Sequence, residues 1–157
     1  MEKNKSGYTL TEMLIVIAII GVLASVMVVA INPARQLAKA RDTQRETDII
    51  VILSAIYQYA SEHSGELPDT DDDPETSNFP DSLTCIGTDL DCFDLASAGE
   101  DDETIVPEYL AEIPTDPRAQ FPREGTDGDT GYKIMVDENG RLTATASGET
   151  REVSQTK

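Results

Sequence analysis

Hydrophobic residues form one dense block near the N-terminus of the chain. Of the 19 residues Met13–Ile31, 17 are hydrophobic, and Gly21 and Ser25 are the exceptions. As an α-helix this block rises about 28 Å, close to the roughly 30 Å thickness of a bilayer's hydrocarbon core. The pattern predicts a membrane-spanning helix, against the alternatives of a cleaved secretory signal and a buried core helix. The block is long for a signal core and too uniformly apolar for a core helix.

Beyond this block the pattern becomes amphipathic and helical. Asn32-Pro33 lies between the two stretches, and Pro33 either kinks one continuous helix or stands in the first turn of a second helix capped by Asn32. We expect the helix to end near Gly65, with His63 as a helix-end residue rather than a ligand. The expected apolar face comprises Ile49, Ile52, Leu53, Ile56, Tyr59 and Ala60.

Residues 67–104 are rich in Asp, Glu, Pro, Ser, Thr and Gly, which predicts a long loop. After it, Pro114 should stop a short helical turn at Glu108–Glu112. Six apolar residues are expected to anchor the loop to the core: Phe79, Leu83, Ile86, Leu90, Phe93 and Leu95.

A β-hairpin is predicted near the C-terminus. Apolar residues alternate on both sides of Asn139-Gly140, a pair that favours a tight turn. The polar stretch after Gly148 is expected to be frayed. The alternating residues are Tyr132, Ile134 and Val136 before the turn and Leu142, Ala144 and Ala146 after it.

Charge is divided as unevenly as hydrophobicity. The chain has a net charge of −18, and residues 49–157 carry six basic and 25 acidic groups, a net −19. Such a body stays solvated and repels nucleic acid, so no nucleic-acid partner is expected. Arg35, Lys39, Arg41 and Arg45 precede it, and one hypothesis places them against the acidic bodies of neighbouring copies.

Cys85 and Cys92 are the only cysteines, seven positions apart. They are a candidate disulfide if the body lies in an oxidising compartment. A metal site at the cysteines is disfavoured, because no C-x-x-C pair exists and His63 is distant in sequence. No nucleophile–base pair or phosphate-binding glycine loop can be named, so the sequence does not predict an enzyme.

Glu12 is anomalous, because a carboxylate at the edge of an apolar span needs a partner or a function. It belongs to the run Gly7-Tyr8-Thr9-Leu10-Thr11-Glu12-Met13-Leu14-Ile15-Val16, which follows a short leader containing Lys3 and Lys5. This run resembles the processing site of type IV prepilins and type II secretion pseudopilins. In that family a membrane prepilin peptidase cuts after the Gly, the new N-terminus is methylated, and a Glu stands fifth after the cut.

The resemblance implies processing between Gly7 and Tyr8. Tyr8 replaces the phenylalanine that the family favours and keeps an aromatic ring at that position. The resemblance also implies that the Glu12 carboxylate pairs with the Tyr8 ammonium of an adjacent subunit during assembly. A second, weaker similarity, to major (G-type) pseudopilins, lies in Tyr109-Leu110, Ile113-Pro114 and Asp116-Pro117.

The fold implied is α+β and type IV pilin-like, with a long N-terminal hydrophobic helix whose C-terminal half packs on a small antiparallel sheet. The expected divisions are a leader (1–7), a membrane and filament-core helix (8–31), its amphipathic continuation (32–64), an acidic head (65–148) and a flexible tail (149–157). G-type pseudopilins often bind calcium in a loop around the sheet, so calcium is a candidate cofactor at Asp127, Asp129 and Asp137.

The function implied is that of a structural subunit of a type II secretion pseudopilus or type IV pilus. Its partners would be other copies in a helical filament, the prepilin peptidase and the inner-membrane assembly platform. It would sit in the cytoplasmic membrane with the N-terminus inside and the body outside, and then in an extracytoplasmic filament. The alternative is a membrane-anchored extracytoplasmic binding module that does not polymerise.

Overall fold

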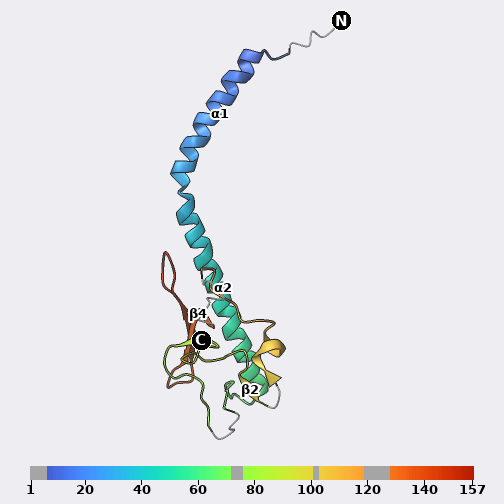
Figure 1. Ribbon diagram of the computed structural model, residues 1–157, viewed down its shortest axis with the longest axis vertical. Coiled ribbons are helices and arrows are strands. Elements are labelled where there is room, and N and C mark those ends of the chain that lie inside the picture. Colours follow the sequence, from blue (N-terminus) through green and yellow to red (C-terminus); the bar gives the residue numbers. More distant parts are fainter. Residues whose placement is uncertain (1–6, 72–75, 101–102, 119–127) are drawn as a thin grey trace. The chain divides into compact units, whose positions relative to one another are not determined.

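The computed structural model describes residues 7–71, 76–100, 103–118 and 128–157. The chain divides into two compact units, Met1–Leu37 and Ala38–Lys157. The first holds the apolar helix α1 and the first residues of α2; the second holds the rest of α2 and all strands (Figure 1).

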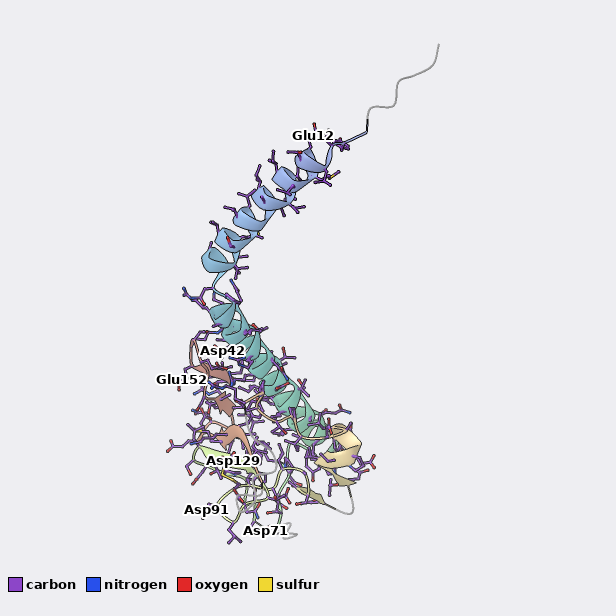
Figure 2. All side chains as sticks on the ribbon, turned by 45° about the horizontal axis from the view of Figure 1, so that its top comes forward. Glu12, Asp42, Asp71, Asp91, Asp129 and Glu152 are labelled. Atoms are coloured by element: carbon purple, nitrogen blue, oxygen red, sulfur yellow. A yellow bond between two sulfur atoms is a disulfide. The ribbon has the colours of Figure 1, made fainter. Side chains whose placement is uncertain are left out.

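Helix α1 spans Leu10–Ile31 and confirms the predicted apolar helix. Gly21 lies inside it without interrupting it, and the Ser25 hydroxyl donates to the carbonyl of Val22 at 2.8 Å. Its apolar side chains point outward on every side and are exposed (Figure 2). The segment Leu10–Val28 is long and apolar enough to cross a membrane.

Asn32 separates α1 from the second helix, α2, Pro33–Glu62. Asn32 adopts a left-handed backbone with φ of 49°, which ends α1. Its side-chain Oδ1 accepts from the backbone N–H of Arg35 at 3.3 Å, as an N-terminal cap does. Of the two alternatives open from the sequence, the structure adopts the capped second helix with Pro33 at its first position.

Helix α2 supplies the centre of the core. Five residues of the predicted apolar face are buried, Ala60 is half-buried, and Ala55 joins them. The helix ends as expected: Gly65 has φ of 98°, and its N–H donates to the carbonyl of Ala60 at 2.7 Å. His63 stacks on the Tyr59 ring with centroids 3.9 Å apart, just beyond the last turn.

A four-stranded antiparallel sheet packs on α2 in the order β1-β4-β5-β6. Its strands are β1 (Thr84–Gly87), β4 (Asp129–Val136), β5 (Leu142–Ala146) and β6 (Val153–Thr156). The α+β fold class is therefore confirmed. The predicted hairpin is β4–β5, with Tyr132 opposite Ala146 and Val136 opposite Leu142.

The C-terminal segment corrects the expectation of a flexible tail. Strand β6 pairs along β5, and Lys157 exchanges two backbone hydrogen bonds of 3.0 Å with Leu142. Val153 is buried and the Tyr57 hydroxyl donates to the carbonyl of Lys157 at 2.6 Å. The tail looked frayed because Val153 is its only strongly apolar residue, and its order comes from backbone pairing that one sequence does not reveal.

The segment expected to be a long loop carries β1 and the short strand β2 (Gly99–Glu100), which pairs with β3 (Glu103–Thr104). Four of the six expected anchors are buried, whereas Leu83 and Leu90 are exposed.

The expected turn at Glu108–Glu112 is displaced toward the N-terminus. The helical turn η1 spans Ile105–Tyr109, and the N–H of Leu110 donates to the carbonyl of Ile105 at 2.9 Å. Ile105 is fully buried, which fixes the turn against the core. Leu110 is extended, so the turn stops before Pro114 can act.

Candidate functional site

The expected processing site lies just before α1. Gly7, Tyr8 and Thr9 belong to no helix or strand, and Tyr8 is 82% exposed. A Cβ added at Gly7 would meet no atom within 4 Å. The Gly7–Tyr8 peptide bond is thus accessible and outside regular structure, as a peptidase substrate must be.

Thr9 and Glu12 form a reciprocal cap at the start of α1. The Glu12 backbone N–H donates to the Thr9 hydroxyl at 3.2 Å, while Glu12 Oε2 accepts from both the backbone N–H and the hydroxyl of Thr9, each at 2.8 Å. This capping box satisfies backbone donors that the first helical turn would leave unpaired.

The capping box gives the Glu12 carboxylate one of the partners that a charge at the edge of an apolar span needs. Thr9 is its hydrogen-bond partner, but Thr9 carries no charge, so the carboxylate still lacks a cation among the described residues. Only Oε2 is used, and Oε1 remains able to accept from another group. Sequence reasoning missed Thr9, although its spacing to Glu12, T-x-x-E, is a recognisable cap signature.

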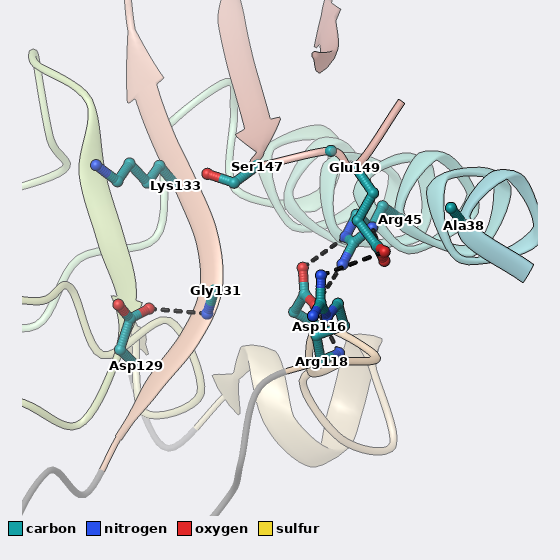
Figure 3. A pocket seen from close by; sticks show the side chains of 10 residues that line it. Ala38, Arg45, Asp116, Arg118, Asp129, Gly131, Lys133, Ser147 and Glu149 are labelled. Atoms are coloured by element: carbon teal, nitrogen blue, oxygen red, sulfur yellow. Dashed lines mark hydrogen bonds and ion pairs between the residues drawn. The ribbon is translucent and has the colours of Figure 1, made fainter. Parts of the chain in front are cut away.

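A second cluster of functional groups surrounds Arg45, on the side of α2 that faces the C-terminal segment (Figure 3). Arg45 is only 1% exposed and binds Asp116 through two hydrogen bonds, of 2.6 and 2.8 Å. It also donates to Asp42 at 2.8 Å. Arg41 donates two hydrogen bonds to Glu149. The cluster therefore joins α2 to segments that lie 71 to 108 residues further along the chain.

This cluster corrects the hypothesis for Arg41 and Arg45, which were expected to lie against neighbouring copies; for Arg35 and Lys39 it stays a prediction. Arg41 and Arg45 are engaged within their own chain. The sequence could not reveal this, because Asp116 and Glu149 are among many carboxylates and nothing local distinguishes them.

Hydrogen bonds hold the cluster's carboxylates ionised. The Arg41 guanidinium lowers the pKa of Glu149 to about 2. The pKa of Asp42 is also well below its usual value, chiefly because the Thr150 hydroxyl and the backbone N–H of Glu149 donate to it. The cleft beside the cluster has a volume of about 620 Å³ and is open, and its lining includes Arg45, Asp116, Glu149, Lys133 and Ser147. We call the group Arg41, Asp42, Arg45, Asp116 and Glu149 the clamp, because it joins α2 to two later segments of the chain.

The calcium candidates do not converge. Asp129 stands at the start of β4 and accepts from the N–H of Gly131, whereas Asp137 follows the end of β4 and pairs with Arg141. Eight strand positions separate the two by about 26 Å, while calcium ligands must all lie within about 2.6 Å of one ion. Asp127 lies outside the described residues. Among the residues described, no three His, Cys, Asp or Glu side chains are grouped to hold a metal.

The two cysteines lie in a disulfide, Cys85–Cys92. It closes a small ring at the end of β1, and Phe93 directly after the ring is buried against Phe79. Leu90 lies on the ring with its side chain fully exposed.

Comparison with known proteins bears on the N-terminal site alone. The family described as "Prokaryotic N-terminal methylation motif" matches residues 3–28, which include Gly7, Tyr8, Glu12 and most of α1. No curated protein and no solved structure matches the chain. The chain thus carries the prepilin-type N-terminal methylation motif, and this motif at the head of an apolar helix is consistent with a type IV pilin-like protein.

Proposed function

We propose that this chain is a type IV pilin-like subunit that polymerises through its N-terminal helix into a type II secretion pseudopilus or a type IV pilus. Prepilin peptidase cuts between Gly7 and Tyr8, and the new N-terminus is methylated. Helix α1 first anchors the subunit in the cytoplasmic membrane, with the body outside, and then joins the filament core. The role is mechanical and involves no substrate turnover.

One observation carries the proposal: a methylation motif stands at the head of a helix whose described apolar side chains are exposed. The described apolar side chains of α1 are exposed from its first turn to its last. An exposed apolar surface of this extent needs a membrane or other proteins to cover it. Processing at the motif allows the subunit to leave the membrane. Copies of α1 in the filament then cover the apolar surface that the membrane had covered.

The disulfide Cys85–Cys92 supports the body-outside topology, because such bonds persist in oxidising compartments. Long domains also cross membranes with little regard to flanking charge. The basic residues of α2 therefore do not argue against this orientation, and two of them serve the clamp inside the body.

The test uses Gly7→Val in cells that express the chain with a prepilin peptidase and an assembly platform. No atom of the described residues lies within 4 Å of a Cβ built at Gly7, so we expect the substitution to leave the fold intact and to affect recognition by the peptidase. We expect uncut precursor in the membrane and no filaments by electron microscopy of sheared fractions.

Ala111→Val is the control, because Ala111 is exposed and lies outside α1, α2 and the strands, and the substitution adds comparable bulk. It should be processed and assembled normally. Processed subunits that never appear in filaments would instead support a membrane-anchored binding module that does not polymerise.

A further inference from the structure

The exposed face of α2 stands out in the charge distribution of this body. Ala40, Thr43, Thr47, Ile50, Val51 and Ser54 are all exposed and fall within a sector of about 100° on the helix, over about 21 Å. None carries a charge, although the body from residue 49 onward has a net charge of −19. We name these six residues the neutral face.

We propose that the neutral face is the surface through which the body of one copy contacts a second copy of the chain. This inference rests on the proposed function, because it identifies where the bodies meet once copies assemble through α1.

The charged side chains of α2 near the neutral face point to the other side of the helix and bind the body there. The charged side chains of α2 between positions 41 and 48 all bind the body: Arg41 and Arg45 in the clamp, Asp42 through Thr150, and Glu46 through Arg151. Asp48 accepts from the buried Tyr132 hydroxyl at 2.6 Å. The charged residues of this stretch are therefore bound to the body, and the opposite side of the helix is left neutral.

Covering the neutral face costs little polar desolvation. The hydroxyls of Thr43, Thr47 and Ser54 donate to carbonyls one turn back, at 3.0, 3.1 and 2.6 Å. A buried hydroxyl that already has its acceptor avoids most of the penalty of losing water. Ile50 and Val51, 43% and 38% exposed, supply the apolar area that would be gained.

Once copies assemble through α1, the distribution of charge on the body favours a second copy as the partner that covers the neutral face. Two bodies of net charge −19 repel wherever carboxylates face one another, so copies held together by α1 should meet on the surface that lacks them. Helix dimensions put the neutral face at about 200 Å², whereas a stable interface buries about 800 Å² per partner. The face is therefore an accessory contact that acts together with α1.

Site-directed photo-crosslinking in the processed protein, with α1 and the body intact, tests the inference. A photoreactive phenylalanine analogue is placed at position 47, at position 112 in an exposed loop, or at position 16 in α1. We expect pairs of this chain crosslinked from positions 47 and 16 and none from position 112.

Each other outcome has a distinct meaning. Crosslinks from position 16 but none from position 47 would overturn the inference and leave the proposed function standing. Crosslinks from position 47 to a protein of different mass would overturn the second copy as occupant. No pairs from either position would contradict assembly itself, and the inference with it.

A charge variant gives an independent measurement. Thr47→Lys makes the chain less acidic, so general repulsion between copies decreases, yet we expect loss of filaments because a charge would be buried. Ser154→Lys, at an exposed strand position, adds the same charge elsewhere and should assemble normally. Equal filament yields from the two variants would contradict the inference.

Discussion

At the scale of single residues, Glu12 combines two roles that substitutions can separate. Its Oε2 caps α1 through Thr9, and its negative charge is the feature proposed to attract the Tyr8 ammonium of an adjacent copy. In an apolar filament core an unpaired carboxylate costs several kcal/mol, which would reject subunits in the wrong register.

Glu12→Gln keeps an oxygen for the cap and removes the charge, since Gln also serves in capping boxes. We expect normal membrane insertion but few or no filaments by electron microscopy. Thr9→Ala is the converse variant: it weakens the cap by about 1 kcal/mol, keeps the charge, and should assemble. Abundant filaments from Glu12→Gln would show that the charge has no role.

Arg45 is the residue on which the body's clamp depends. Its side chain is 2% exposed and is bound by Asp42 and Asp116. Arg45→Met leaves these carboxylates without their cation, and removing one partner of a buried ion pair costs about 3–5 kcal/mol. We expect a loss of that order in the free energy of unfolding, measured by denaturant titration in detergent.

The control for this prediction is Arg141→Met, which breaks an exposed pair with Asp137 in the β4–β5 turn. An exposed pair contributes at most about 1 kcal/mol. If both variants lost equally little stability, the clamp would not hold the body together.

At the scale of elements, the contact between α2 and the segment that precedes β6 should depend on pH. The pKa of Glu149 is about 2 in the folded chain, against an ordinary value of 4.5, because Arg41 binds it. A lowered carboxyl pKa stabilises the fold above the ordinary pKa, and this stabilisation is lost as the pH falls through the folded value.

The measurement compares the chain with a Glu149→Gln variant, so that the other carboxylates cancel. We expect the difference in free energy of unfolding to be complete above about pH 4.5 and to disappear toward about pH 2. A difference that stayed constant or grew on acidification would contradict the role assigned to Glu149.

Elements specified by local patterns were predictable from the sequence, and those specified by distant pairing were not. The apolar run of α1, the helical spacing of the α2 face and the alternation around Asn139-Gly140 each lie within a few turns or strand positions. Strand β6 has one apolar anchor, Val153, and becomes a strand by pairing with β5.

The same distinction holds for the candidate site. Gly7, Tyr8 and Glu12 lie within six positions of the matched methylation motif, so the sequence could point to them, and their individual roles stay predictions. The Arg45 clamp joins residues up to 104 positions from Arg45, and no spacing rule connects them. The calcium candidates came from resemblance alone, and Asp129 and Asp137 proved to stand at opposite ends of β4.

At the scale of the whole molecule, the chain combines an apolar helix that needs partners with an acidic body that repels copies of itself. Arg41 and Arg45 neutralise carboxylates of their own body, so they are not free to attract the body of another copy. In the proposed filament, we expect acidic bodies to meet on the neutral face of α2 while α1 supplies most of the contact between copies.

The mass of the mature N-terminal peptide tests whether this chain is processed as a prepilin. The membrane form, purified from cells that contain a prepilin peptidase, is digested and its first peptide is sequenced by mass spectrometry. We expect a peptide that begins at Tyr8 with one methyl group on its α-amine. An intact Met1 in the membrane form, or a cut beyond α1, would contradict it.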